Sequence, residues 1–79
     1  FQSAYYNRGV SKGLLKDYYG AIADYTKAIE LDPKYQFAYY NRGVSKNKLG
    51  DTNGACGDMK KATKLGSEDA AKWVKGYCN

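Results

Sequence analysis

The 79-residue chain has no histidine, the side chain that serves most often as a general base or a metal ligand. It also lacks a glycine-rich phosphate loop and a carboxylate pair in a recognisable catalytic motif. The two cysteines, Cys56 and Cys78, have no base partner that would activate a nucleophile and too few companion ligands to hold zinc. These absences predict a protein that is not an enzyme, with no catalytic residues, no metal and no cofactor.

Long apolar runs are also missing. No segment approaches the eighteen or so consecutive apolar residues of a membrane span, and no charged-then-apolar signal sequence opens the chain. The 13 basic and 8 acidic residues give a net charge of +5, but they are spread over both halves without a block of like charge. We therefore expect a soluble protein with no membrane partner and at most a mild attraction to anionic partners.

What the sequence does contain is an internal repeat of 34 residues. The segment AYYNRGVSK at residues 4–12 recurs unchanged at 38–46, and aligning 2–35 with 36–69 gives 18 identities in 34 positions. Self-similarity at this period is typical of stacked helix-turn-helix units that share one core. Because the chain begins at Phe1, inside the repeat pattern, we expect it to be a piece of something longer.

Apolar residues recur at steps of three and four, which predicts helices. The expected helices cover residues 2–15, 18–31, 34–49, 52–65 and 68–77. Asp17 and Ser67 stand where a side chain can cap the second and fifth helices, and Gly66 stands where the fourth should end. Pro33 is expected in the first turn of the third helix, where its fixed φ is favourable.

Residues of set type stand at fixed offsets in both units. The first unit has seven of them: Tyr5, Gly9, Tyr18, Ala21, Tyr25, Ala28 and Pro33. The second unit keeps four of these positions: Tyr39, Gly43, Ala55 and Ala62. It departs at three, which hold Thr52, Met59 and Ser67. A further aromatic, Trp73, follows Tyr39 by 34 residues. With these residues the chain resembles the tetratricopeptide repeat family.

The resemblance implies an all-α fold, a right-handed α-solenoid of two antiparallel helix-turn-helix repeats plus a C-terminal capping helix. It implies a single domain of residues 1–79, with repeat 1 at about 2–35, repeat 2 at about 36–66 and the capping helix at about 67–78. Small residues should let the helices of each pair approach closely, while aromatics fill the space between pairs. Most tyrosines, Tyr5, Tyr25 and Tyr39 among them, are therefore expected in the core.

In this family the concave groove is lined by particular positions of each first helix. The resemblance places eleven residues there: Ser3, Tyr6, Asn7, Val10, Gly13, Phe37, Tyr40, Asn41, Val44, Asn47 and Lys48. Aromatics interleaved with amides suit a peptide, because asparagine can pair with a peptide backbone and exposed tyrosine gives rigid contact area. An ordinary solvated face is the alternative interpretation.

Some family members bind acidic peptide tails through a clamp of lysine, asparagine, asparagine, lysine and arginine. Asn7 and Asn41 match its two asparagine positions, but Ser3, Ala71 and Lys75 stand at the other three. The match is partial, so recognition of a terminal carboxylate does not follow from it.

Four charged residues should form structural ion pairs. Asp24 follows Arg8 by 16 residues on the paired helix, and Asp58 follows Arg42 by the same distance. A buried guanidinium needs a carboxylate partner, so we expect one bridge inside each repeat rather than ligand binding by the arginines.

The two cysteines lie at about equal distances on either side of the turn Gly66-Ser67. Antiparallel packing about that turn would bring Cys56 and Cys78 to the same level, where side-chain direction decides whether they can bond. A disulfide and two free thiols both remain open. A bridge would favour a secreted or periplasmic protein, and free thiols would favour a cytoplasmic one.

The leading interpretation is a non-enzymatic protein-protein interaction module that binds a peptide segment of a partner in its concave groove. One alternative is self-association as a homodimer through the first helix, whose outward face a further repeat would normally cover. Another is single-stranded RNA binding, because related repeats of 35 residues read RNA and the chain is basic. The 34-residue period and the scattered charge make a nucleic-acid partner the less favoured alternative.

Overall fold

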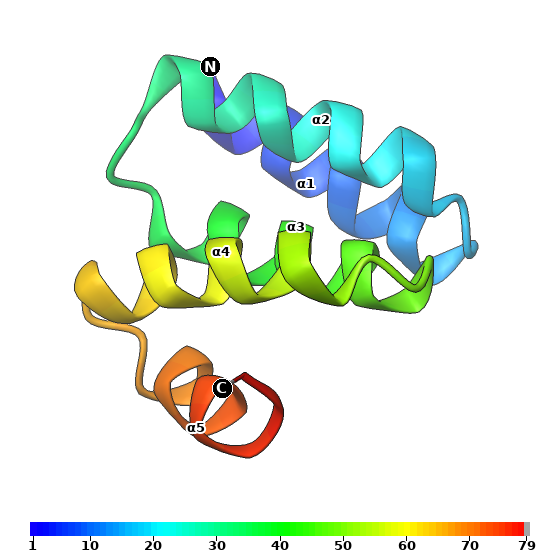
Figure 1. The fold of residues 1–79 in the computed structure, drawn as a ribbon. Coiled ribbons are helices and arrows are strands. Elements are labelled where there is room, and N and C mark those ends of the chain that lie inside the picture. Colours follow the sequence, from blue (N-terminus) through cyan, green and yellow to red (C-terminus); the bar gives the residue numbers. More distant parts are fainter. Residues whose placement is uncertain (79) are drawn as a thin grey trace.

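The computed structural model of this chain describes residues 1–78, which form five α-helices joined by short turns (Figure 1). They are α1 (Gln2–Leu14), α2 (Tyr18–Leu31), α3 (Gln36–Lys48), α4 (Thr52–Lys64) and α5 (Glu68–Tyr77). No strand occurs among these residues. Asn79, the last residue of the predicted domain, lies outside the described part. The predicted all-α class and helical-repeat solenoid are confirmed.

The helices form two antiparallel hairpins and a cap. α1 and α2 make the first hairpin, α3 and α4 make the second, and α5 follows α4 (Figure 1). α2 packs on α3, and α5 packs on α4. Each helix therefore contacts chiefly its neighbours in the sequence, which is the contact pattern of a solenoid.

Side-chain caps start three of the helices. Asp17 Oδ1 accepts a hydrogen bond from the Gly20 N–H at 3.0 Å, and Ser67 Oγ accepts one from the Ala70 N–H at 3.1 Å, so both predicted caps are confirmed. Asp51 caps α4 in the same way. The predicted stop at Gly66 is also confirmed, since its φ of 103° is a left-handed conformation in which the helix cannot continue.

The third helix begins at Gln36, two residues later than predicted, and Pro33 lies in the preceding turn instead of the first helical turn. Asp32 explains the difference. Its carboxylate accepts the Lys34 N–H at 3.1 Å and its backbone carbonyl accepts the Tyr35 N–H at 3.1 Å, which closes a turn before the helix can start. The prediction for Pro33 was therefore wrong.

Three helix ends also differ slightly from the prediction. α1, α3 and α4 each end one residue earlier, and the residues that follow serve as C-caps: Leu15, Leu49 and Leu65. The periodicity of apolar residues continues through these leucines, and each leucine N–H still donates to the carbonyls three and four residues earlier. Their φ of −87° to −89° and ψ of 2° to 6° are no longer helical, so the helix ends before them. Boundaries of this kind commonly shift by a residue.

The core consists of two clusters, one with its buried residues on α2 and α3 and the other with its buried residues on α4 and α5. Four residues are buried in the first: Ala21, Tyr25, Ala28 and Ala38. Three are buried in the second: Met59, Ala62 and Ala70. Within residues 1–78 Tyr25 is the only buried tyrosine: Tyr5 and Tyr39 are half-buried against these clusters, and Tyr19 and Tyr77 are exposed. The prediction that most tyrosines lie in the core was therefore wrong.

Candidate functional site

The predicted groove positions divide into packed and exposed residues. Tyr6 and Val10 of α1 pack against the first core cluster, and Tyr40 and Val44 of α3 pack against the second. Asn41 is half-buried. The exposed members are Ser3, Asn7, Phe37, Asn47 and Lys48. The inner face of α1 and α3 is thus a partly apolar surface with amide and lysine side chains on it.

A hydrogen bond joins the two first helices across this face. Asn41 Nδ2 donates to the Tyr6 hydroxyl at 2.8 Å and to the Phe37 carbonyl at 3.1 Å. Both amide hydrogens of Asn41 are therefore used within the protein, which leaves its Oδ1 atom to accept a hydrogen bond from a ligand. Asn41 cannot also donate to a ligand carboxylate, and this weakens the partial match to the carboxylate clamp further.

Tyr6 lies in an aromatic cluster at the same place. Its ring centroid is 5.8 Å from that of Tyr25 and 5.1 Å from that of Tyr35. Burial raises the pKa of the Tyr6 hydroxyl, and the neighbouring Tyr35 adds to this, while the hydrogen bond from Asn41 opposes it. The hydroxyl therefore stays protonated at neutral pH and keeps its own hydrogen free to donate.

A cavity of about 220 Å³ opens between α1 and α3, beside the start of α2. Its walls are Val10, Gly13, Leu14, Tyr18, Tyr25, Asn41, Val44, Ser45 and Lys48. Five of these were predicted groove residues: Val10, Gly13, Asn41, Val44 and Lys48. The other predicted residues do not line it: Ser3, Tyr6, Asn7, Phe37, Tyr40 and Asn47.

Sequence reasoning missed four cavity residues: Leu14, Tyr18, Tyr25 and Ser45. Tyr25, a predicted core residue, also lines the cavity, because its ring lies across Gly9 and its hydroxyl reaches α1 near Gly13. A Cβ atom placed at Gly13 would stand 3.9 Å from the Tyr25 hydroxyl oxygen. The signal that could have revealed this is the second glycine one helical turn after Gly9, which the second repeat replaces with Asn47.

The two predicted arginine–aspartate pairs meet inside their repeats. Arg8 Nη2 lies 2.7 Å from Asp24 Oδ1 and Arg8 Nε donates to Oδ2 at 2.9 Å. Arg42 holds Asp58 in the same fork geometry at 2.7 and 2.8 Å. Hydrogen bonds from Arg8 lower the pKa of Asp24, although its burial opposes the shift. These carboxylates are occupied within the protein and are not available to a ligand.

Each aspartate has a second cation that sequence reasoning missed. Lys12 Nζ lies 3.2 Å from Asp24, and Lys46 Nζ lies 3.1 Å from Asp58. Both lysines follow their arginine by four residues, a spacing that places them on one helix face.

The two arginines differ in burial, contrary to the expectation of a buried guanidinium in each repeat. The Arg42 side chain is 17% exposed, but that of Arg8 is 59% exposed. α2 causes the difference, because it lies against α3 and its Thr26 hydroxyl accepts a hydrogen bond from Arg42 Nη1 at 3.2 Å. No helix within residues 1–78 covers Arg8 in the corresponding way.

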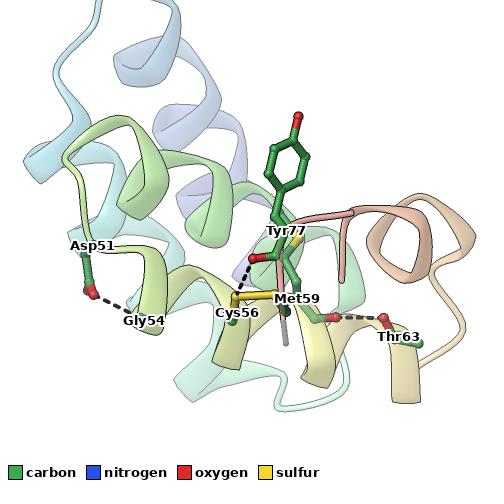
Figure 2. Close-up of a disulfide and its surroundings, with 7 residues drawn as sticks. Asp51, Gly54, Cys56, Met59, Thr63 and Tyr77 are labelled. Carbon is green, nitrogen blue, oxygen red and sulfur yellow. Dashed lines mark hydrogen bonds between the residues drawn. A yellow bond between two sulfur atoms is a disulfide. The ribbon is translucent and has the colours of Figure 1, made fainter. Parts of the chain in front are cut away.

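Cys56 of α4 and Cys78, which follows α5, form a disulfide with their Cα atoms 5.8 Å apart (Figure 2). The bridge ties the end of α5 to the middle of α4. The Tyr77 ring beside it points away from the bridge and is exposed. The residues around the disulfide do not line the cavity between α1 and α3, so the bridge lies apart from it.

Comparison with known families completes the assignment. Models of the tetratricopeptide repeat match residues 3–35 and, overlapping them, residues 24–57. The chain belongs to the tetratricopeptide repeat family. No curated protein sequence matches the chain significantly.

Tetratricopeptide repeats generally mediate protein–protein interactions and are typically non-enzymatic. Within residues 1–78, no helix of this repeat protein has the length and apolar character required to cross a membrane. On its inner face, the α1–α3 cavity combines apolar walls with a lysine and the buried residues Tyr25 and Ser45.

Proposed function

We propose that this tetratricopeptide repeat protein is a non-enzymatic module that binds a peptide segment of a partner protein in the concave groove formed by α1 and α3. The observation that carries the proposal is the cavity between these helices, which five groove positions line. Repeats of this family generally bind proteins, and the cavity supplies this chain with a place for a ligand side chain.

The groups around the cavity suit an extended peptide. Val10 and Val44 provide apolar walls, and Asn41 Oδ1 is free to accept a hydrogen bond from a peptide N–H. Phe37, exposed on α3, adds aromatic contact area next to Asn41. A peptide needs both kinds of contact, because apolar burial supplies affinity while backbone pairing fixes its direction.

The test uses peptides selected from a random displayed library on the wild-type protein, with affinities then measured by fluorescence anisotropy. Gly13→Leu places a side chain in the cavity and should weaken binding by about tenfold or more. Gly57→Leu is the matched control, because Gly57 is also helical and has nothing within 4 Å of an added Cβ. Circular dichroism should show the same helical content in both variants.

Two results would reject the groove. One is a Gly13→Leu variant that binds the selected peptides as tightly as the wild type. The other is a library selection that yields no peptide bound above background.

A second candidate function, self-association, is favoured by the outward face of α1. Ala4 and Ala38 occupy equivalent positions in the repeat, yet Ala38 is fully buried under α2 while Ala4 is exposed. The exposed aromatic Phe1 lies beside Ala4. We propose that a second copy of the chain can cover this face of α1, since the face carries the same residues that α2 buries on α3.

Sedimentation velocity over a hundredfold concentration range tests this candidate. A concentration-dependent dimer is expected, and Ala4→Glu should shift it to monomer because the change would bury a charge in the interface. A wild-type chain that stays monomeric at millimolar concentration would exclude the dimer. If Ala4→Glu removed peptide binding as well, the groove would be formed between chains.

A further inference from the structure

Two nearly buried hydroxyl groups open into the α1–α3 cavity without a partner. Tyr25 is 3% exposed and Ser45 is 4% exposed, and both residues line the cavity. Within residues 1–78 neither hydroxyl forms a hydrogen bond. Every fully enclosed side-chain nitrogen or oxygen atom of that region has a partner, so these two hydroxyl oxygens retain some exposure. Because both residues line the cavity, a ligand atom there that accepts hydrogen bonds could satisfy their hydroxyls.

The charge around the cavity is positive. Lys48 lines it and has no ion-pair partner within residues 1–78, whereas Lys12 and Lys46 are held by aspartates. No carboxylate is among the lining residues. A basic chain with an unpaired lysine beside two hydroxyl donors favours an anionic ligand group.

We propose that the cavity binds the side-chain carboxylate of a glutamate in the peptide ligand. The carboxylate accepts hydrogen bonds from the Tyr25 and Ser45 hydroxyls and pairs with the Lys48 ammonium group. The two methylene groups of the glutamate pack against Val10, Leu14 and Val44. This inference rests on the peptide-binding function proposed above and names the chemistry that the ligand must have.

A glutamate side chain suits the cavity better than the carboxylate at the end of a peptide. A terminal carboxylate lies one carbon atom from its own backbone amide, and the aliphatic walls would leave that amide without a partner. With glutamate, the backbone lies further out, where Asn41 Oδ1 can accept its N–H. Burial raises the pKa of Tyr25 to about 12, with Tyr6 and Asp24 adding to the shift, so this hydroxyl remains a donor at neutral pH.

The second repeat does not contain this arrangement, which supplies matched controls. Met59 stands at the position equivalent to Tyr25, and Asn47 stands at the position equivalent to Gly13. Ser11, the equivalent of Ser45, is exposed on α1 and does not line the cavity. Ser11→Ala therefore removes the same group from the same repeat position without touching the site.

The experiment compares two hexapeptides of alanine and leucine that are blocked at both ends and carry either glutamate or glutamine at one central position. Binding is followed by NMR titration of the ¹⁵N-labelled protein. The glutamate peptide should bind about tenfold more tightly than the glutamine peptide, with shifts centred on the amides of Gly13, Ser45 and Lys48.

Variants then assign the preference to the three groups. Tyr25→Phe, Ser45→Ala and Lys48→Met should each reduce the glutamate preference to about threefold or less, and Ser11→Ala should leave it unchanged. Tyr25→Phe should not lower the unfolding midpoint, because the hydroxyl has no internal partner to lose. A merely structural role for the hydroxyl would give the opposite pattern, a less stable protein with an unchanged preference.

The possible outcomes separate this inference from the function on which it rests. Equal affinity for the two hexapeptides, with library-selected peptides still sensitive to Gly13→Leu, would overturn the glutamate assignment and leave the groove in place. Tighter binding of a glutamine hexapeptide with a free C-terminal carboxylate would also overturn it. Failure of both blocked hexapeptides to bind at millimolar concentration would reject it, and failure of the library selection as well would reject the peptide-binding function.

Discussion

At the scale of single residues, close packing in the first hairpin depends on a glycine that faces a tyrosine. A Cβ atom at Gly9 would lie 2.7 Å from Cε1 and 2.9 Å from Cδ1 of the buried Tyr25 ring. The ring is rigid and enclosed, so it cannot withdraw as a flexible methionine end could. In contrast, a Cβ at Gly57 of α4 would have nothing within 4 Å.

This contrast predicts opposite effects of one substitution at two helical glycines. Gly9→Ala should lower the free energy of unfolding by about 1–3 kcal/mol, because the added methyl overpacks the core. Gly57→Ala should raise it by about 0.5–1 kcal/mol, because alanine favours the helix and meets no neighbour. Urea denaturation measures both values, and changes of the same sign would contradict the packing argument.

Asp24 provides a prediction for the dependence of stability on pH. Its pKa is lowered in the folded protein by the hydrogen bonds from Arg8, so the folded state binds the proton less well than the unfolded chain. The stabilisation is therefore present above the unfolded pKa of about 3.9 and is lost as pH falls through the lower folded value.

We expect Asp24→Asn to lower stability at pH 7 and to flatten the acid side of the stability curve. Denaturant unfolding at intervals between pH 2 and pH 7 gives the comparison. Asp17→Asn is a control at an exposed aspartate that retains capping ability. An Asp24→Asn curve parallel to that of the wild type at low pH would show that Asp24 does not contribute to the acid response.

At the scale of elements, α5 closes the end of the second hairpin. Ala70 is buried in the second core cluster, and Trp73 and Val74 pack against it. Without α5, Met59 and Ala62 of α4 would lose this cover. The helix is only ten residues long, so the packing and the disulfide must supply the stability that its length does not.

Reduction of the disulfide should therefore loosen this helix first. The bridge closes a loop with a sequence separation of 22 residues, and such a loop contributes about 3 kcal/mol to stability. Dithiothreitol should lower the unfolding free energy by that amount, and the Cys56→Ser/Cys78→Ser variant should be as stable as the reduced protein and insensitive to dithiothreitol. Two titratable thiols in the native, oxidised protein would contradict the bridge.

At the scale of the whole molecule, the identical segments 4–12 and 38–46 lie in different surroundings. α2 covers the segment in α3, while within residues 1–78 no helix covers the same face of α1. The contrast is clearest at Ala38, which is fully buried, and its equivalent Ala4, which is exposed. One residue type at one repeat position thus belongs to the interior in one unit and to the surface in the other.

A pair of matched substitutions should reveal this difference. Ala38→Leu should lower the free energy of unfolding by about 1–3 kcal/mol, because the larger side chain does not fit between α2 and α3. Ala4→Leu should change it by less than about 0.5 kcal/mol. Urea unfolding at low micromolar concentration keeps any dimer from contributing, and equal effects at the two positions would show that the α1 face is covered after all.

The sequence by itself determined the elements and their pairing. The caps at Asp17 and Ser67 depend on interactions within a few residues, and the 34-residue period is a self-similarity of the sequence, so both could be read without the fold. The 16-residue spacing of Arg8 and Asp24 also sufficed, because two antiparallel helices joined by a short turn must bring such residues to one level. The start of α3 was the largest departure, since the Asp32 turn competes locally with the helix.

Only the tertiary structure decided the composition of the candidate site. The bond from Asn41 to Tyr6 joins residues 35 apart in the sequence, and it changes Asn41 from a donor to an acceptor for any ligand. The Tyr25 hydroxyl reaches the cavity because Gly9 and Gly13 of the neighbouring helix leave room for its ring. Local sequence cannot specify these contacts, because they depend on how far the helices approach and how they are rotated when the two hairpins stack.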